Sequence, residues 1–382
     1  MSRPIHVWIY PTRSCNFRCT YCYEEHEPAF MTPETAERAV EWAFDQAALA
    51  GATGVSFSFF GGEPLLGIVA FRTVVLHGRA TASARGMTVS FRANTNGSLI
   101  TDKLAEFLIE HGVELDLSLD GDRETNDAFR KTRSGESAYD SVGGVERIAA
   151  LQQRGLGIGI NMVVGPDTVR ALSRNVKLFW DHGITAIQAL PLFDGGRSWT
   201  DADLAALDDE LAQIAEALLQ KLTEGGQDDI LDFNPFAKVI RLIVAARDPA
   251  RARRIRGETY CGIGRQQFSV DVDGNIYACP RFAHESRLDR TDTKLVIGNV
   301  VSRDYNREVV DHFRAWNPRQ AARGPCGACR LALECVYQCV GENLSWNGDE
   351  YGVAPTVCRV SAIVHKYASG FADLLFPAAA AA

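Results

Sequence analysis

The sequence predicts an α/β fold built on a parallel sheet, because short apolar runs alternate with amphipathic stretches from residue 5 to about residue 195. Six of these runs have the length and composition of buried strands: HVWIYPT, GVSFSFF, TVSFRANT, VELDLSLD, LGIGINMVV and ITAIQALPL. Strand–helix units in series are compatible with an open doubly wound sheet and with a partial barrel. In both folds, ligands bind at the carboxyl ends of the strands.

Amphipathic stretches separate and follow these strands. Helices are expected at residues 33–51, 137–155, 200–226, 234–248 and 357–376. The first of them has Thr32 as a predicted N-cap and Gly51 as a predicted stop.

The alternation of strands and helices ends near residue 225. From Cys261 to Cys358 the chain is rich in loops, with a hairpin turn expected at Asp273–Gly274. We therefore predict four segments, namely a core α/β domain at 1–225, linker helices at 226–258, a loop-rich domain with a last helix at 259–376, and a disordered tail at 377–382.

The composition is that of a globular protein, since 46% of the 382 residues are hydrophobic and 23% are charged. The net charge of −8 provides no broad basic field for nucleic acid or anionic lipid. No uninterrupted apolar run reaches the ~18 residues of a membrane span, and the N-terminus lacks the anatomy of a signal peptide. We therefore expect a cytoplasmic protein with neither nucleic acid nor membrane as a partner. Thiols stay reduced in that compartment, so closely spaced cysteines indicate metal binding.

Three cysteines follow the first predicted strand with the spacing C-x3-C-x2-C, namely Cys15, Cys19 and Cys22. Three thiolates from one loop can bind three corners of a four-iron cluster and leave the fourth iron open. Structural zinc sites usually combine paired C-x2-C units into four ligands. The spacing therefore favours an iron–sulfur cluster, with zinc as the alternative.

This loop and the segment after the second strand together resemble the radical S-adenosylmethionine (SAM) enzymes. That family has the same cysteine triad, an aromatic residue before the last cysteine, here Tyr21, and a Gly-Gly-Glu-Pro motif after its second strand, here Gly61 to Pro64. The resemblance implies a partial (β/α)6 barrel in which the triad binds a [4Fe-4S] cluster whose open iron chelates SAM.

The same resemblance assigns roles around SAM. Gly61, Gly62 and Glu63 would offer backbone carbonyls and a carboxylate to the SAM ammonium, and glycine would let the backbone come close. One electron, from a donor such as flavodoxin or ferredoxin, would cleave SAM to a 5′-deoxyadenosyl radical that abstracts hydrogen from a substrate.

Further positions match SAM contacts of the family. Ser118 would lie near the ribose, Arg130 would bind the SAM carboxylate or ribose, and Leu192 would pack on the adenine. A strand-end cap and a surface ion pair are the alternatives for Ser118 and Arg130. Residues 95–97 are expected to form a turn that borders the same pocket.

The other seven cysteines follow the pattern C-x12-G-x4-C, then C-x2-C-x5-C-x3-C, then a final cysteine. This pattern resembles the SPASM extension of radical SAM enzymes that mature peptides or dehydrogenate small molecules. The resemblance assigns a distal auxiliary cluster to Cys326, Cys329, Cys335 and Cys358, and a nearer one to Cys261, Cys279 and Cys339. Zinc in the compact segment is the alternative. The expected cofactors are therefore three [4Fe-4S] clusters and SAM.

Three classes of function remain open. They are maturation of a ribosomal peptide by crosslinking or epimerisation, dehydrogenation or epimerisation of a small molecule such as an aminocyclitol (with sulfatase-type Ser/Cys oxidation), and electron transfer alone. A pure electron carrier has no use for the Gly-Gly-Glu-Pro motif. In sulfatase-maturing relatives an Asp that acts as a base follows the second auxiliary-cluster cysteine, but here Pro280 follows Cys279. The CPRF segment is similar to a form found in peptide maturases, so peptide maturation is the preferred interpretation.

Arg281 would then contact a substrate carboxylate or the surroundings of the cluster, with a salt bridge as the alternative. Many peptide maturases carry a precursor-recognition domain before the triad, whereas only fourteen residues precede Cys15 here. We therefore expect a precursor peptide that binds through a separate recognition protein or a groove on this chain.

Three such clusters, with one iron reserved for SAM, need one more protein ligand than the ten cysteines available. The deficit falls at the nearer auxiliary cluster, because residues 254–260 contain no cysteine. Glu258, a water or a small thiol would complete that cluster, or its iron stays open to bind a substrate thiolate. A cluster used only for electron transfer is the alternative.

Overall fold

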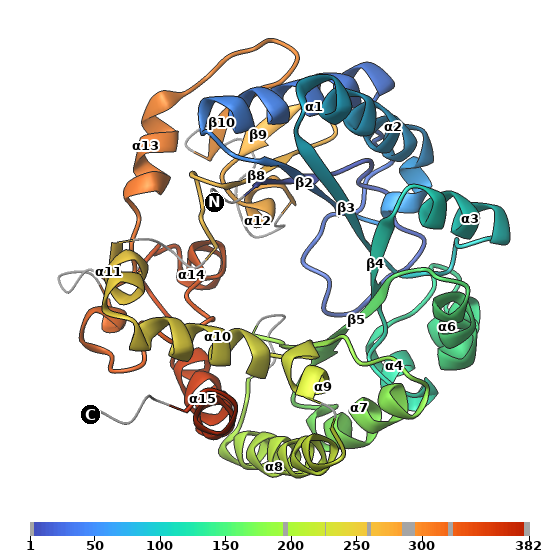
Figure 1. Cartoon of the computed structure of the whole chain (residues 1–382). Helices are drawn as coiled ribbons and strands as arrows, with labels where there is room; N and C mark the ends of the chain where they lie inside the picture. The colour runs from blue at the N-terminus through green and yellow to red at the C-terminus, as the bar shows by residue number, and fades with distance from the viewer. Residues whose placement is uncertain are drawn as a thin grey trace. The chain divides into compact units, whose positions relative to one another are not determined.

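The computed structural model describes residues 4–193, 198–225, 227–257, 261–284, 295–319 and 324–377 (Figure 1). The chain forms two compact units. The first comprises Met1–Ser118, Arg130–Ile158 and Cys261–Trp316, and the second comprises Leu119–Phe129, Gly159–Tyr260 and Asn317–Ala382. Each unit thus combines segments that are distant in sequence.

The strands of the first unit lie in the order β10-β9-β8-β1-β2-β3-β4. Their bounds are β1 (Ile5–Ile9), β2 (Gly54–Phe59), β3 (Thr88–Thr95), β4 (Val113–Ser118), β8 (Gln267–Val270), β9 (Asn275–Tyr277) and β10 (Val296–Asn299). Strands β8, β1, β2, β3 and β4 run parallel, and β9 and β10 continue the sheet in antiparallel fashion. The first four predicted strands are therefore confirmed, and so is the hairpin turn at Gly274, which has a φ of 84°.

The helices of the first unit are α1 (Pro33–Leu49), α2 (Ile68–Arg85), α3 (Asp102–Glu110), α5 (Ala138–Val142), α6 (Gly144–Gln153), α12 (Pro280–His284) and α13 (Arg307–Ala315), with a 3-10 turn at Pro64–Gly67. Of these helices, α1, α5 and α6 lie in the predicted helical stretches, whereas α12 and α13 lie in the region that was predicted to be rich in loops. Thr32 caps α1 as predicted, because its side chain accepts a hydrogen bond from the Thr35 N–H at 3.1 Å. The helix expected at 137–155 is instead two helices, since Gly143 adopts a φ of 85° between them.

Helices α1 and α2 lie side by side over the strands β2 and β3 (Figure 1). Aromatic rings fill the space between the layers: Phe57 stacks on Phe91 with ring centres 5.9 Å apart, and Phe59 contacts Phe71 at 4.0 Å. A Cβ on Gly78 of α2 would come within 3.1 Å of the Phe91 ring. Glycine at that position therefore lets the helix approach the sheet closely.

One helical segment, Pro64–Arg85, is long and apolar enough to cross a membrane by length and composition, with a mean hydropathy of 1.2 in its most apolar window. This segment contains no uninterrupted apolar run of that length and was not predicted as a membrane span. Phe71 and Val74 of this segment are fully buried, as expected for a helix that packs on a sheet.

The second unit holds the strands β5 (Ile158–Val164), β6 (Ile187–Pro191) and β7 (Phe233–Asn234), which pair in parallel in this order. Its helices are α4 (Arg123–Phe129), α7 (Leu172–Asp181), α8 (Asp201–Thr223), α9 (Gln227–Asp232), α10 (Phe236–Arg247), α11 (Pro249–Gly257), α14 (Val340–Asn347) and α15 (Pro355–Leu375), with 3-10 turns at Val169–Ala171 and Pro325–Ala328. The two remaining predicted strands and the three predicted later helices are all present.

Long helices pack together in this unit. Helix α8 begins with a capping box between Thr200 and Asp203. Helix α15 is anchored to it, because Lys366 and the Tyr367 hydroxyl both bond to Asp208, at 2.9 and 2.7 Å. This packing holds the start of α15, where Cys358 lies, on a rigid support.

The two compact units divide the chain differently from the four predicted segments. Strand β8 pairs with β1, with Gln267 opposite His6, so the hairpin that follows Cys261 joins the N-terminal strands. The predicted linker 226–258 contains α9, α10 and α11. Of the predicted tail at 377–382, only residue 377 is described. The predicted segment boundaries remain predictions.

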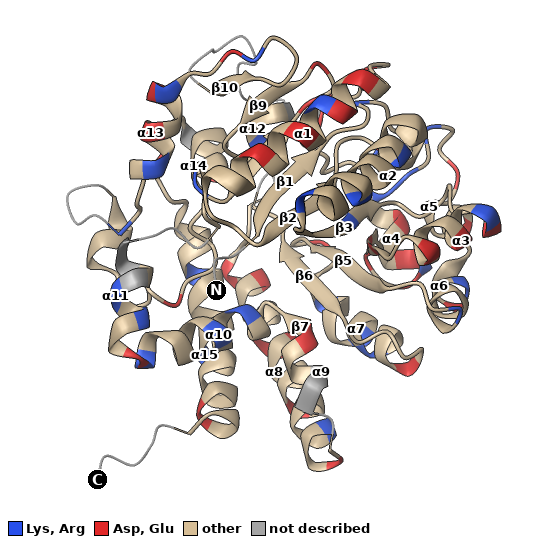
Figure 2. Cartoon of the chain, turned by 45° about the horizontal axis from the view of Figure 1, so that its top comes forward, with Lys and Arg blue, Asp and Glu red and all other residues tan. Residues whose placement is uncertain are grey.

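Acidic and basic side chains are mixed over the helices, as on α1 and α13 (Figure 2). Pairs such as Arg38 with Glu41 on α1 and Arg307 with Asp311 on α13 illustrate this mixing.

Candidate active site

The first predicted cluster loop begins directly after β1. Cys15 and Cys19 are half-buried and Cys22 is exposed. The Phe17 N–H lies 3.3 Å from the Cys15 sulfur, and His26 Nε2 lies 3.8 Å from the Cys22 sulfur. Burial raises the pKa of the Cys15 thiol to about 12. A thiolate therefore requires a positive centre to replace the proton, as a bound cluster would do.

The segment after Arg130 holds this loop in place. The Arg18 N–H donates to the Lys131 carbonyl at 2.7 Å, and the Arg133 N–H donates to the Asn16 carbonyl at 2.8 Å. The Arg130 guanidinium is buried and lies 5.4 Å from the centre of the Tyr21 ring. The structure therefore brings Arg130 and Tyr21, both predicted SAM contacts, together beside the cysteine triad.

The Gly-Gly-Glu-Pro turn lies against the same loop. The Glu63 N–H donates to the Ser14 carbonyl at 2.8 Å, and the Gly62 N–H donates to the Thr12 carbonyl at 3.3 Å. A Cβ on Gly62 would lie 2.2 Å from the Ser14 oxygen, and one on Gly61 would lie 2.6 Å from the Thr12 oxygen. These glycines were expected to allow close approach to SAM, whereas the structure shows that close approach to the cysteine loop already requires them.

The Glu63 carboxylate is buried, with 1% of the residue exposed. It accepts hydrogen bonds from the Thr95 hydroxyl and the Asn96 N–H, both at 2.7 Å, and from the Leu65 N–H at 3.1 Å. Burial outweighs these donors and raises the Glu63 pKa to about 7. The carboxylate thus joins the end of β2 to the end of β3, a role that the sequence analysis did not anticipate.

The predicted turn at 95–97 also contacts the cysteine loop. The Asn96 side-chain amide donates to Asn16 Oδ1 at 2.8 Å, and the Asn16 amide donates to Ser98 Oγ at 2.8 Å. Gly97 has a φ of 78° and allows the tight turn. The cysteine triad, the glycine-rich turn and the turn after β3 therefore form one hydrogen-bonded assembly.

The two other predicted SAM contacts lie at strand ends. Ser118 is the last residue of β4 in the first unit. Leu192 follows β6 in the second unit, where it is buried, donates to the Val164 carbonyl at 2.8 Å, and accepts from Trp199 Nε1 at 2.7 Å. Both stand at carboxyl ends of strands, the edge where ligands of such sheets bind.

The residues predicted for the nearer auxiliary cluster divide between the units. Cys261 and Cys279 belong to the first unit, and Cys339, the N-cap residue of α14, belongs to the second. Glu258 and residues 259–260 lie outside the described part of the chain. The structure therefore assigns each of the three cysteines to a unit, but it gives no geometry for the three together.

Two hydrogen bonds hold the backbone at Cys279 and Pro280. The buried Tyr10 hydroxyl donates to the Pro280 carbonyl at 2.7 Å, and Ser269 Oγ donates to the Cys279 carbonyl at 3.0 Å. The Arg281 guanidinium lies 4.4 Å from the centre of the Tyr23 ring, close to the triad in sequence. This arrangement adds a cation–π contact to the roles expected for Arg281.

The four cysteines predicted for the distal cluster line one cavity of about 120 Å³ in the second unit: Cys326, Cys329, Cys335 and Cys358. Most of its other lining side chains are apolar, including Leu331, Val353 and Val357. In the described part of the chain, no three His, Cys, Asp or Glu side chains have the close spacing that a single metal ion requires. Four thiols on one mostly apolar cavity suit a four-iron cluster, with zinc as the alternative.

One buried polar atom supports the fit of this cavity to a cluster. The hydroxyl of Tyr337, which also lines the cavity, is buried without a hydrogen-bond partner among the described residues. A buried hydroxyl without a partner is rare unless a bound group satisfies it.

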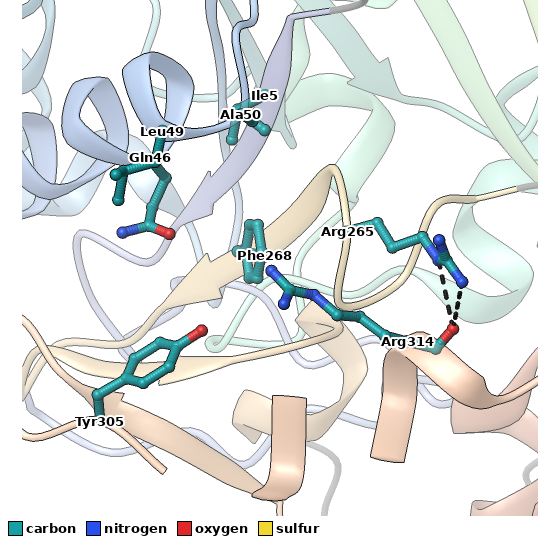
Figure 3. Close-up of a pocket in the computed structure, with 8 residues that line it drawn as sticks. All are labelled: Ile5, Gln46, Leu49, Ala50, Arg265, Phe268, Tyr305 and Arg314. Carbon is teal, nitrogen blue, oxygen red and sulfur yellow. Dashed lines mark hydrogen bonds between the residues drawn. The ribbon is translucent and has the colours of Figure 1, made fainter. Parts of the chain in front are cut away.

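A roomier cavity of about 400 Å³ lies elsewhere in the first unit, between α1 and the start of β8 (Figure 3). Gln46, Phe268, Tyr305 and Arg314 are among its lining residues, and the Arg265 guanidinium donates twice to the Arg314 carbonyl. None of the predicted cluster or SAM residues lines it. A search for the site by cavity volume alone would therefore not have identified the cysteine sites.

An α/β partial barrel with a three-cysteine loop beside a glycine-rich turn defines a cluster-binding enzyme. The sequence matches the Radical SAM superfamily over residues 9–177. The serine-type anaerobic sulfatase-maturating enzyme of Klebsiella aerogenes is 30% identical over 342 residues, which cover 88% of this chain and 80% of that protein. The chain therefore belongs to the radical SAM superfamily and is related to the anaerobic sulfatase-maturating enzymes.

Solved structures agree in fold. Native anSMEcpe with bound AdoMet and Cp18Cys peptide has a TM-score of 0.73 at 22% identity, covering 97% of this chain and 99% of that one. Streptococcus suis SuiB bound to the precursor peptide SuiA has a TM-score of 0.59 at 17% identity, covering 94% and 76%. The expected partial barrel with a C-terminal extension is thereby confirmed.

Proposed function

We propose that this radical SAM enzyme modifies a residue of a ribosomally made peptide or protein, by a thioether or carbon–carbon crosslink or by epimerisation. The observation that carries the proposal is the assembly around the cysteine triad, in which hydrogen bonds join the loop to the segments of Glu63 and Asn96. The two solved structures with the same fold hold a peptide, which supports a peptide substrate here.

In this proposal Cys15, Cys19 and Cys22 bind a [4Fe-4S] cluster, and Arg130 and Ser118 with Leu192 bind SAM. When bound, the cluster and SAM supply a 5′-deoxyadenosyl radical for hydrogen abstraction. The chain's own residues hold the site in shape. The backbone of the glycine-rich turn fixes the cysteine loop, and the buried Glu63 carboxylate fixes that turn to β3.

Pro280 argues against sulfatase-type oxidation by this chain. Its ring offers no proton acceptor where the sulfatase-maturing relatives are expected to carry an Asp base. The neighbouring Arg281 is a cation held over Tyr23, suited to bind an anionic group of the substrate. Oxidation of a serine or cysteine residue remains a second candidate because of the 30% identity to the Klebsiella aerogenes enzyme. Dehydrogenation of a small molecule is a third.

The auxiliary sites complete the proposal. The four-thiol cavity would hold the distal [4Fe-4S] cluster, and Cys261, Cys279 and Cys339 would hold the nearer one, with one iron open to a substrate thiolate or completed by another ligand. The electron for SAM cleavage would come from a flavodoxin or ferredoxin, and a separate protein would present the precursor peptide. A reducing, cytoplasmic environment suits these thiol-bound clusters.

The first test needs no substrate. The reduced, anaerobic enzyme should convert SAM to 5′-deoxyadenosine, and replacing Cys15, Cys19 and Cys22 by Ala should abolish that product. Replacing Cys326 and Cys329 by Ala is the matched control, expected to lose about four irons per chain while retaining SAM cleavage. Undiminished cleavage in the triple variant would contradict the proposal.

A second test separates the substrate classes. Peptides with a central Cys, Ser or Ala are incubated with the enzyme and SAM, and the products are read by mass spectrometry. A crosslinked or epimerised product supports peptide maturation. Conversion of Cys or Ser to an aldehyde would instead establish sulfatase-type oxidation in spite of Pro280.

A further inference from the structure

The four-thiol cavity has a polar contact directly at one of its sulfurs. The Ser361 hydroxyl donates to the Cys335 sulfur at 3.2 Å. Ser361 is 7% exposed and lies on α15 three residues after Cys358, so the same helix supplies a predicted ligand and this donor. A hydroxyl fixed on a buried helix face keeps its direction toward the sulfur.

A guanidinium is hydrogen-bonded to a residue that lines the same cavity. Arg319 Nε donates to the carbonyl of Ala332, a lining residue, at 2.7 Å, and Arg319 Nη1 donates to the Ile255 carbonyl at 2.9 Å. Burial lowers the pKa of Arg319, and the negative charges that Cys335 and Cys326 can carry oppose this shift. Two carbonyls therefore hold a permanent cation close to two of the four thiols.

The acid nearest in sequence has its own partner. Glu334 precedes Cys335, and its carboxylate is 2.5 Å from His365 Nε2 on α15. Its carboxylate is thus hydrogen-bonded to a side chain of α15, while the hydroxyl of Ser361 and the charge of Arg319 act on the sulfurs.

We propose that Ser361 and Arg319 raise the reduction potential of the cluster bound by Cys326, Cys329, Cys335 and Cys358. One-electron reduction adds one negative charge to the cluster and transfers no proton. A hydrogen bond to a ligand sulfur and a nearby cation both stabilise the charge-rich reduced state, and they act strongly in a cavity with apolar walls. The distal site is thereby built to hold an electron. This inference rests on the proposed function, because it requires that a cluster binds there.

The test is an anaerobic redox titration of the reconstituted full-length enzyme with dithionite, followed by EPR. The distal signal is identified by its loss in the Cys326→Ala, Cys329→Ala variant. Ser361→Ala and Arg319→Gln should each disfavour reduction about tenfold, which is a midpoint lower by about 59 mV for one electron. Ser361→Thr and Arg319→Lys, which keep the hydroxyl and the charge, should stay near the wild-type midpoint.

Two residues at the far end of α15 from Cys358, or in contact with that end, provide matched controls. Arg247 bonds to Asp373, fifteen residues beyond Cys358 and therefore about 22 Å along the helix. Ser369 bonds only within its own helix in the described structure, to the Lys366 carbonyl. Arg247→Gln and Ser369→Ala should leave the distal midpoint unchanged.

Iron content separates the possible failures. Unchanged distal midpoints in Ser361→Ala and Arg319→Gln, with iron retained, would overturn the inference. Loss of about four irons in both variants would also overturn it, because the two residues would then serve cluster retention. A wild-type enzyme that binds no distal cluster would contradict the proposed function instead.

Discussion

The cysteine triad and the four-thiol cavity are held by different kinds of structure. The triad lies in an irregular loop that three other segments hold by hydrogen bonds, as in the backbone contacts of Arg18 with Lys131 and of Glu63 with Ser14. The four-thiol cavity has mostly apolar walls, and the rigid helix α15 supplies both Cys358 and Ser361.

This difference matches the different tasks of the two sites. In the proposed function the first site admits SAM and a substrate, whereas the second only stores an electron. Exposure of the thiols does not distinguish the two sites, because Cys22 of the triad and Cys329 and Cys358 of the cavity are all exposed. The geometry of the cysteine triad therefore depends on backbone segments that lie close together, whereas the geometry of the four-thiol cavity depends on side-chain packing.

The largest effect is expected from a substitution that blocks the close backbone approach between the glycine-rich turn and the loop of the cysteine triad. In Gly62→Ala the new Cβ would meet the Ser14 carbonyl at 2.2 Å, and a backbone oxygen next to Cys15 cannot move aside without shifting the loop. Overpacking costs about 1–3 kcal/mol even where flexible side chains can adapt. We expect loss of about four irons per chain and of 5′-deoxyadenosine formation, with the distal EPR signal retained.

Gly370→Ala is the control for this substitution. A Cβ there meets nothing within 4 Å, and the position lies inside α15. That variant should keep all its iron, and Gly62→Ala with wild-type iron and activity would show that the close approach is dispensable.

The next effect is a pH dependence that only the triad region should show. The Glu63 pKa is raised to about 7 from an ordinary value of 4.5, so the folded state binds a proton more tightly than the unfolded state. Stability is then fully present below about pH 4.5 and is lost as the pH rises through 7, by roughly 3 kcal/mol in total. Glu63→Gln, which cannot titrate, should lack this loss.

Anaerobic urea unfolding at pH 5, 6, 7 and 8 measures the prediction. The wild type should lose stability relative to Glu63→Gln across this range, whatever the fixed cost of the amide. Parallel curves for the two proteins would mean that the hydrogen bonds from Thr95 and Asn96 keep the Glu63 pKa low.

The sequence predicts what is local and periodic. Six strands follow from apolar runs, and the cap at Thr32 follows from its neighbours. The resemblance to the SPASM pattern grouped the four distal cysteines, and the structure places all four on one cavity. Cys339 and Cys261, by contrast, fall in different units.

Contacts between distant segments were not predictable in the same way. Nothing near Glu63 in sequence shows that Thr95 and Asn96 would bind its carboxylate, because that pairing depends on β2 and β3 being neighbours. The role of Gly62 was assigned to a ligand because the motif is known for it, while the clash with Ser14 exists only in the folded chain.

The smallest effect is expected from removal of one buried tyrosine hydroxyl in each region. The buried Tyr10 hydroxyl donates to the Pro280 carbonyl at 2.7 Å, whereas the buried Tyr337 hydroxyl has no hydrogen-bond partner among the described residues. Tyr10→Phe removes a made bond and should lower the unfolding free energy by about 1 kcal/mol. Tyr337→Phe removes an unsatisfied hydroxyl and should be neutral or slightly stabilising in protein without the distal cluster. The Cys326→Ala, Cys329→Ala background provides that protein, and urea unfolding measures both changes in it.

If Tyr337→Phe lowers the unfolding free energy as much as Tyr10→Phe there, the Tyr337 hydroxyl has a hydrogen-bond partner of its own and no longer supports binding of a cluster in the cavity. If the cost appears only in cluster-loaded enzyme, the cluster itself satisfies that hydroxyl, and the apolar cavity is then as specifically built for its occupant as the polar loop is for the triad.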